Sequence, residues 1–266
     1  MLARWRQLWQ ARREHAALRR RAIPDDLWKR TLVRYPFLQR RDEADALELR
    51  RLTSLFLDRK EFSTSGGLLL TDAMAVAIAA QACLPVLRLG LARYDSFVGI
   101  VVHADEVVAQ REVADHDGVV HAYEEVLAGE AMPGGPLMLS WSDVRAAGRS
   151  GAAAYNVVIH EFAHVLDLAN GVADGMPLLP PELPAAQWRR ILAGEFARFV
   201  ARVQREEATT LDPYGSEGED EFFAVASEAF FVSPEGMRAE HPDLYALFVG
   251  FYRQDPAADR PARRKA

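Results

Sequence analysis

The chain has 266 residues, of which 50% are hydrophobic and 26% are charged, and its formal net charge at pH 7 is −6. This length and composition predict one sizeable globular domain, or a small domain joined to a larger one. The single cysteine, Cys83, excludes an internal disulfide and a four-cysteine zinc site, and it is typical of a reducing compartment. The arginine-rich N-terminus lacks the features of a secretory signal, and the most apolar run, residues 73–87, is too short to cross a bilayer. We therefore expect a cytoplasmic protein without a membrane span.

Basic residues are concentrated at the start of the chain. Residues 1–60 contain 16 Lys and Arg against 8 Asp and Glu, whereas residues 61–266 contain 16 against 30. The first arginines are interleaved with Trp5, Trp9 and other apolar residues, so this segment is basic and amphipathic. Such a segment can contact nucleic acid, an anionic membrane or an acidic partner. We favour the other interpretation, a solvated helix that packs against the acidic remainder of the same chain, and no nucleic-acid motif accompanies it.

The spacing of apolar residues predicts helices in the first third of the chain and short strands after it. The expected helices are one from Pro24 that stops before Pro36, one over 42–60, and one over 72–84 capped by Thr71, with a loop at 63–67. The expected strands cover 97–102, 106–113, 119–127 and 137–141, with a turn at 115–118 and a loop at 133–136. The strand at 137–141 is either an edge strand that pairs with an extended substrate or an ordinary strand of the sheet.

Residues 160–164 form the HExxH pattern His-Glu-Phe-Ala-His within an apolar helix that Asn170-Gly171 ends. Two histidines four residues apart lie on one face of a helix, so both imidazoles can bind one metal ion. Glu161 lies close enough to take a proton from a metal-bound water. Burying these polar side chains is costly unless a metal satisfies them. The pattern therefore indicates a zinc peptidase, and the alternative is a surface helix with two ordinary histidines.

A catalytic zinc ion usually takes three protein ligands and keeps one position for water. The position six residues after His164 is Asn170 and not histidine, so the third ligand should be a distant carboxylate. A helix predicted over 216–232, with the capping-box pattern Ser216-x-x-Glu219, offers Glu221 and Glu228 seven residues apart. Either carboxylate could bind the metal while the other supports a histidine. An acid at position 221 also has a structural explanation, because the helix dipole favours acids in the first turn.

Several segments resemble the Mlc titration factor A family. They are residues 156–167, 212–214 and 221–231, together with 23–24, 60–62, 70–72, 79–83 and 139–143. These segments follow one another in order along nearly the whole chain. The resemblance implies a zinc-dependent peptidase with a catalytic core similar to the lethal-factor type of zincin. It also implies aminopeptidase activity and binding of the glucose-uptake repressor Mlc, although no motif identifies a repressor-binding surface.

The resemblance further implies a role for each site residue. His160, His164 and Glu221 would bind Zn2+, and Glu161 would be the general base. Tyr214 stands seven residues before Glu221, the spacing of a tyrosine in that family's site, and would donate a hydrogen bond to the developing oxyanion. Without the resemblance, Tyr214 is a tyrosine that closes a turn. Asp167 either orients a ligand imidazole or caps the helix.

The expected fold class is α+β, with a helical N-terminal region over 1–85 packed on a zincin-type metallopeptidase domain over 86–258. That domain would contain a small mixed sheet and the HExxH helix, and a flexible charged tail would follow over 259–266. The expected function is zinc-dependent, aminopeptidase-like hydrolysis of peptides, with binding of an Mlc-like transcriptional repressor as a second role. The alternative is a non-catalytic regulatory protein that sequesters a transcription factor and uses zinc structurally. Direct binding of nucleic acid is not expected.

Overall fold

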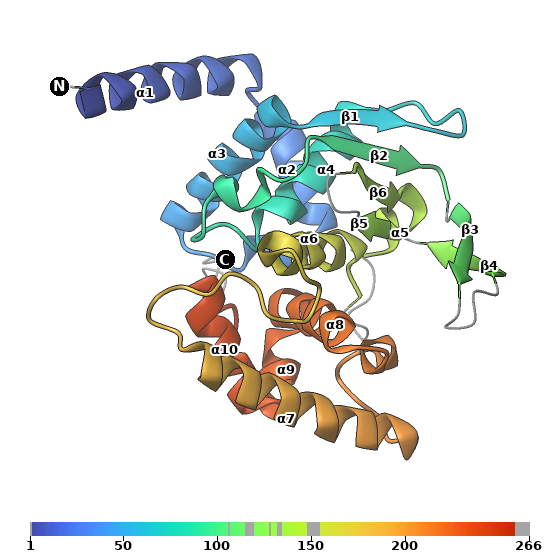
Figure 1. The fold of residues 1–266 in the computed structure, drawn as a ribbon. Coiled ribbons are helices and arrows are strands. Elements are labelled where there is room, and N and C mark those ends of the chain that lie inside the picture. Colours follow the sequence, from blue (N-terminus) through green and yellow to red (C-terminus); the bar gives the residue numbers. More distant parts are fainter. Residues whose placement is uncertain are drawn as a thin grey trace, which may run out of the picture.

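The structure is a computed structural model that describes residues 2–105, 107–114, 120–127, 129–131, 135–147 and 155–258. It is an α+β protein, as predicted, with helices around a small sheet (Figure 1). The helices are α1 (Leu2–Arg20), α2 (Asp25–Arg34), α3 (Glu43–Arg59), α4 (Asp72–Cys83), α5 (Trp141–Ala146), α6 (Val157–Asp167), α7 (Ala185–Gln204), α8 (Glu219–Val232), α9 (Pro234–Glu240) and α10 (Pro242–Tyr252). The strands are β1 (Glu61–Thr64), β2 (Gly99–His103), β3 (Val107–Ala114), β4 (Val120–Leu127), β5 (Gly129–Ala131) and β6 (Leu137–Ser140). The described part of the chain also forms the short 3-10 helices η1 (Pro36–Gln39), η2 (Leu91–Tyr94), η3 (Leu168–Asn170) and η4 (Pro213–Ser216).

The main sheet has the strand order β1-β2-β6-β5. The first three strands are parallel, with Phe62 opposite Ile100 and Ile100 opposite Leu137. The fourth strand, β5, is antiparallel to β6, so the sheet is mixed, as predicted. β3 and β4 form a separate antiparallel pair at one side of the molecule (Figure 1).

One expectation for the sheet is wrong, and the structure decides between the two alternatives for another strand. The segment 63–67 was expected to be a loop, but Ser63 and Thr64 belong to β1 because their backbone pairs with Val101 and Val102 of β2. This pairing comes from a distant part of the chain, and no local pattern reveals it. The strand at 137–141 is not an edge strand, because β2 lies on one side of β6 and β5 lies on the other. The expected turn at 115–118 and the expected tail at 259–266 lie outside the described residues.

Side-chain caps begin two of the predicted helices. The Thr71 hydroxyl accepts the Met74 backbone N–H at 3.3 Å, and the Asp42 carboxylate accepts that of Asp45 at 2.8 Å. The capping box predicted at Ser216 does not form. Ser216 ends η4, and the residue that precedes α8 is Gly218, which gives no side-chain cap. A proline-initiated turn therefore occupies the positions from which the box would have started.

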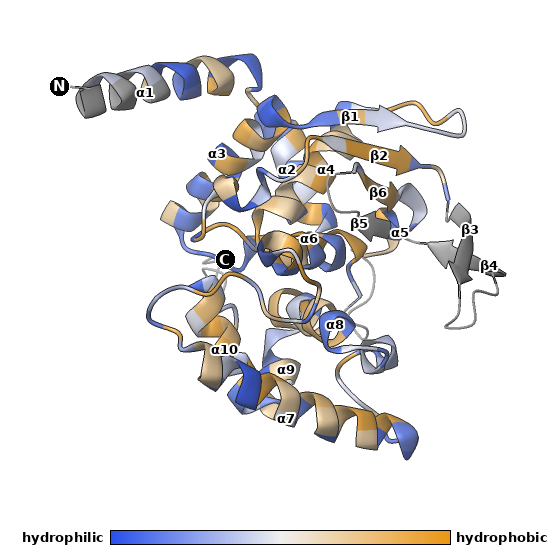
Figure 2. Cartoon of the chain, in the orientation of Figure 1, coloured by the Kyte–Doolittle hydropathy of each residue, from blue (hydrophilic) through white to orange (hydrophobic). Residues whose placement is uncertain are grey.

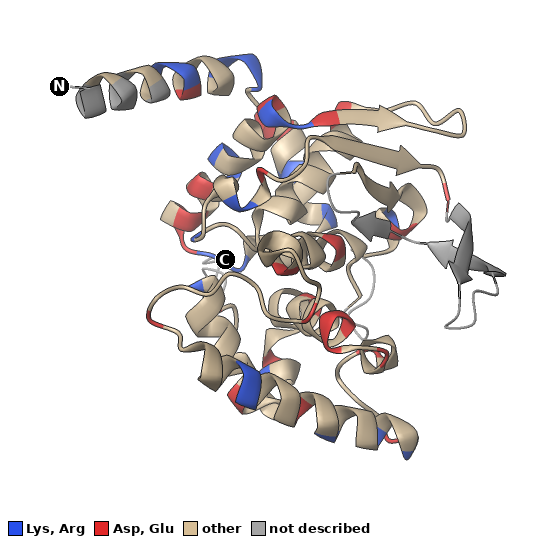
Figure 3. Ribbon diagram, in the orientation of Figure 1, with Lys and Arg blue, Asp and Glu red and all other residues tan. Residues whose placement is uncertain are grey.

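The basic helix α1 extends from the rest of the molecule (Figures 1 and 3). Near its end, Ala17 is buried and Arg20 forms a salt bridge to Asp58 of α3 at 2.9 Å. Trp5 and Trp9, nearer its beginning, are 72% and 61% exposed. The second half of the helix therefore packs against the same chain, but its partner α3 belongs to the basic first 60 residues and not to the expected acidic remainder. The two tryptophans lie outside that contact.

The helix α6 lies between the sheet and the C-terminal helices, in an apolar interior (Figures 1 and 2). Its Phe162 ring is fully buried and lies 4.8 Å from the Tyr94 ring and 5.6 Å from the Phe56 ring, measured between centroids. One cluster of buried apolar side chains includes Phe162 and also Ile78 of α4. The boundary expected between a helical N-terminal region (1–85) and a metallopeptidase domain (86–258) remains a prediction. No helix among the described residues is long and apolar enough to cross a membrane.

Candidate metal centre

The HExxH residues lie in α6, and the start of this helix sets their direction. The Asn156 side-chain oxygen accepts the Ile159 backbone N–H at 3.0 Å and so caps the first turn. From this start, His160 and His164 lie one turn apart on the same face. Their Nε2 atoms are 3.1 Å apart. The local sequence alone therefore brings two ring nitrogens together.

The helix α8 brings a carboxylate to this pair. The Glu221 Oε2 atom lies 3.1 Å from His160 Nε2 and 3.4 Å from His164 Nε2. These three ligand atoms all lie within 4.8 Å of one another. In the part of the chain that the structure describes, no other group of three or more His, Cys, Asp or Glu side chains has such an arrangement.

The three atoms fit a zinc ion. Glu221 Oε2 is buried without a hydrogen-bond partner, although it faces both imidazoles. Zinc bonds of about 2.0–2.1 Å in a tetrahedral site separate neighbouring ligand atoms by about 3.3–3.4 Å. The separations of 3.1, 3.1 and 3.4 Å come close to this value. Two imidazoles and one carboxylate are also a donor set that catalytic zinc sites use.

A second carboxylate contacts His160 from the opposite side of its ring. Glu228 is 3% exposed, and its Oε1 lies 2.8 Å from His160 Nδ1. The Glu228 oxygen can accept a hydrogen bond from Nδ1, and Nε2 is then the ring nitrogen that faces Glu221. The spacing left open which carboxylate faces which nitrogen, and in the structure Glu221 faces Nε2 while Glu228 faces Nδ1.

The charges in this cluster depend on one another. Burial opposes a charge on His160, but the adjacent Glu221 and Glu228 side chains outweigh burial and hold the His160 pKa well above its usual value. Burial likewise disfavours ionisation of Glu221, but the adjacent rings of His160 and His164 outweigh burial and hold the Glu221 pKa well below the usual range. Glu161 is 5% exposed, and burial raises its pKa although the two histidines oppose the rise. Protons and a metal ion therefore compete for the same nitrogen atoms.

Tyr214 lies beside the cluster in η4. Its ring centroid is 6.0 Å from that of His160, and the side chain is 45% exposed. Packing of η4 on α8 sets this position. A Cβ atom at Gly215 would lie 3.3 Å from the Val225 Cβ, so glycine permits the close approach. The Asp212 side chain accepts the Tyr214 backbone N–H at 3.0 Å and fixes the turn.

Comparison with known proteins agrees with this geometry. The model of the family described as glucose-regulated metallo-peptidase M90 matches residues 7–253. The chain belongs to this family. Similar proteins include three named Mlc titration factor A. The protein from Pectobacterium atrosepticum is 35% identical over 229 residues, which is 85% of each chain. The protein from Edwardsiella ictaluri is 39% identical over 189 residues, 70% of this chain and 71% of the relative. The protein from Klebsiella pneumoniae subsp. pneumoniae is 34% identical over 236 residues, 88% of each chain.

Membership of the M90 family makes this chain a metallopeptidase-family protein and confirms the resemblance found in the sequence. The five residues expected at the site occupy one region of the structure. Three of them form the ligand cluster, Glu161 is the neighbour of His160 on α6, and Tyr214 lies beside the His160 ring. Their roles in catalysis stay predictions.

Asp167 holds the loop that follows α6 in this M90 chain. Its Oδ2 accepts the Gly175 backbone N–H at 2.8 Å, and the Gly175 carbonyl accepts a hydrogen bond from the Trp188 indole at 2.8 Å. Burial raises the Asp167 pKa to about 6. No hydrogen bond among the described residues joins Asp167 to an imidazole. Of the two roles considered for it, these contacts favour the structural one.

Gly175 lies where α6, α7 and α8 meet, and replacing it should disturb the position of Glu221 on α8. A Cβ atom at this position would lie 2.6 Å from the Glu219 carbonyl oxygen and 2.8 Å from Leu192 Cδ2, at a backbone φ of +71°. We expect Gly175→Ala to lower the free energy of unfolding by about 2–4 kcal/mol, from the positive φ and the overlap together. Zinc affinity should fall as well, because Glu219 begins the helix that carries Glu221.

Gly171→Ala is the matched control for this variant. Gly171 also has a positive φ, +95°, but a Cβ atom there would meet nothing within 4 Å. Urea unfolding and zinc titration of both variants separate the backbone strain from the overlap. Equal effects of the two substitutions would show that the contact with α8 does not matter.

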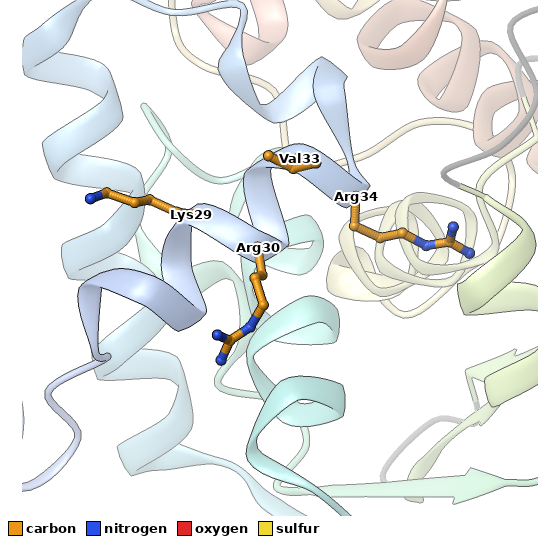
Figure 4. A pocket seen from close by; sticks show the side chains of 4 residues that line it. All are labelled: Lys29, Arg30, Val33 and Arg34. Carbon is orange, nitrogen blue, oxygen red and sulfur yellow. The ribbon is translucent and has the colours of Figure 1, made fainter.

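A separate hollow of about 460 Å³ lies on the outer face of α2 and is lined by Lys29, Arg30, Val33 and Arg34 (Figure 4). Arg30 forms a salt bridge to Asp26 at 2.8 Å, and Arg34 donates to the Arg145 carbonyl. None of the lining residues belongs to the metal cluster. We assign it no part in the chemistry.

Proposed function

We propose that this chain is a zinc-dependent peptidase, with His160, His164 and Glu221 as the zinc ligands. The observation that carries the proposal is the convergence of three ligand atoms from α6 and α8, one of them a buried carboxylate oxygen without a hydrogen-bond partner. Membership of a metallopeptidase family supports it.

When bound, a zinc ion supplies Lewis acidity for the attacked carbonyl and the attacking water. Glu161, next to His160 on α6, accepts the proton that the water gives up and returns it to the leaving amine. Tyr214 donates a hydrogen bond to the oxygen on which negative charge develops, which its exposed position beside His160 permits. Glu228 orients the His160 ring through Nδ1 and leaves Nε2 as the nitrogen that would bind the ion.

An extended substrate would pair with β5. This strand is the outer strand of the sheet beyond β6 and lies against α6. Among the described residues no strand pairs with the other edge of β5, so this edge can accept a further strand, as in other cases of peptide recognition by strand addition. The zincin-type core and the preference for free N-termini rest on the family resemblance.

Binding of a transcriptional repressor is a second proposal. It is supported by the name Mlc titration factor A that the similar proteins carry. Sequestering a repressor with a purely structural zinc would be the non-catalytic version of this role. The buried Glu161 favours catalysis, because a structural zinc site needs no general base. A cytoplasmic location stays a prediction from cysteine usage.

A peptide panel with metal analysis tests the main proposal. The purified chain should contain about one zinc ion per molecule and cleave short peptides, faster with a free N-terminus than with an acetylated one. A chelator should stop cleavage, and zinc should restore it. Cleavage that survives full removal of metal would reject zinc-dependent hydrolysis. Equal cleavage of free and acetylated peptides would reject only the aminopeptidase preference.

A further inference from the structure

Buried polar side chains form a continuous path from α4 to the metal cluster. Gln81 and Asn156 are fully buried, and Glu228 is 3% exposed. Gln81 is the only polar residue among the buried residues of α4. Burying an amide or a carboxylate costs free energy unless hydrogen bonds satisfy it. The partners of these three side chains therefore show what holds each of them in place.

The two amides on this path each have one orientation that suits their neighbours. Gln81 Nε2 donates to the Ala77 carbonyl at 3.0 Å, which leaves Gln81 Oε1 to accept from Asn156 Nδ2 at 2.8 Å. Asn156 Oδ1 then faces α6 and accepts the Ile159 N–H at 3.0 Å. Turning either amide over would place donor against donor or acceptor against acceptor. The carbonyl of Ala77 thus determines the orientation of the cap of α6.

The path continues through the backbone of Asn156. Its N–H donates to one carboxylate oxygen of Glu228, and the other oxygen lies 2.8 Å from His160 Nδ1. Asn156 has the extended conformation of a helix cap, with φ −153° and ψ 93°. Because its side chain is held at both ends, its N–H keeps a fixed direction toward Glu228. Both oxygens of the carboxylate are then committed, one of them to the His160 ring.

We propose that Gln81 is a positioning residue for the zinc site and acts on His160 through Asn156 and Glu228. The proposal rests on the proposed zinc site. Without the Gln81 oxygen, the Asn156 side chain loses the acceptor for its Nδ2 group and can rotate away from the start of α6. The Asn156 backbone N–H then no longer has a fixed direction, and it no longer holds the Glu228 carboxylate in place. His160 Nε2 is then less constrained to face Glu221. The helical N-terminal region therefore contributes to the metal site through this contact.

The plain alternative is that Gln81 only stabilises the fold. Thr53→Val is a matched control for it. Thr53 is fully buried, and its hydroxyl donates to the Leu49 carbonyl within α3, which packs against α4. This substitution removes one buried polar group close to α4 without touching the path to His160.

The experiment compares zinc affinities of full-length variants by competition with a chromogenic chelator. Gln81→Met, similar in shape but without the acceptor, is expected to weaken zinc binding about tenfold, at the lower end of the range for the loss of groups that support a ligand. Thr53→Val is expected to leave zinc binding unchanged. Gln81→Glu, in the neutral form that burial favours, keeps a donor and an acceptor and should restore most of the affinity.

A second variant removes the other partner of the hydrogen bond between Gln81 and Asn156. Asn156→Ser keeps a good helix cap but removes the Nδ2 donor, so it is expected to weaken zinc binding as Gln81→Met does. If Gln81→Met does not fold, the zinc affinity of Asn156→Ser still tests the proposal. Normal affinity in the folded Gln81→Met or Asn156→Ser protein overturns the proposal. An equal loss in Thr53→Val also overturns it.

Nitrogen NMR of the metal-free protein separates this proposal from the proposed function. The His160 Nδ1–H donates to the buried Glu228 carboxylate, so this proton should exchange slowly with solvent in the wild type and faster in Gln81→Met. If the wild type binds no zinc, the proposed function fails, and the exchange measurement still tests the path. Unchanged exchange in Gln81→Met would reject the positioning role.

Discussion

The Glu161→Gln variant is expected to lose peptidase activity while it still folds and binds zinc. Glutamine has nearly the same shape, but it cannot accept the proton from the attacking water. General bases contribute about 10²–10⁴-fold to rate, so kcat should fall by this factor. The three ligand atoms belong to other residues, so zinc affinity should remain close to that of the wild type. Steady-state kinetics and metal analysis of one preparation measure both quantities.

This combination of results separates the two candidate functions. A repressor-binding protein with structural zinc would show no zinc-dependent peptide cleavage in either form. Unchanged cleavage by Glu161→Gln would reject the proposed mechanism. Loss of zinc together with activity would mean that Glu161 supports the site structurally. Circular dichroism of both proteins checks that the helix α6 has formed.

The Glu221→Ala variant is expected to lose tight zinc binding. Removing a group that only supports a ligand lowers metal affinity by about 10–100-fold, so loss of a ligand should exceed this range. The partly buried imidazoles of His160 and His164 would then hold the ion with two nitrogen atoms. Isothermal titration of the metal-free protein with zinc measures the change.

Glu219→Ala provides the control for this variant. Both residues are acidic and lie in the first turn of α8, where the helix dipole favours them equally, but Glu219 is exposed and lies outside the metal cluster. A ligand role predicts that Glu221→Ala alone weakens zinc binding. Similar small losses of stability in both variants, with zinc binding intact, would leave only the structural explanation for Glu221.

The centre of the site could be predicted from the sequence because it depends on local geometry. His160 and His164 need only one helical turn to meet, and the apolar residues around them predict that helix. The position of Glu221 depends on the packing of α8 on α6. Helix spacing left Glu221 and Glu228 open, and the resemblance favoured Glu221. In the structure Glu221 completes the cluster with the histidines, and Glu228 contacts the other nitrogen of His160.

The supporting contacts could not be predicted, since they join segments that are distant in the sequence. Gln81 was visible only as a polar residue within an apolar run, and its partner Asn156 is 75 residues away. No local pattern in the sequence indicates that Gly175 lies against the Glu219 carbonyl. The same limit explains the error at Ser63 and Thr64, whose strand partner lies in β2.

The order of the segments along the chain has a consequence for biosynthesis. The two histidines are translated well before α8, which supplies the third side chain of the metal cluster and, through Glu228, the partner of His160. A nascent chain that ends before α8 therefore offers a metal ion only two nitrogens of a helix whose neighbours are missing. If the proposed function holds, tight metal binding has to follow the docking of α8, and peptidase activity is not expected on the ribosome before this helix has emerged.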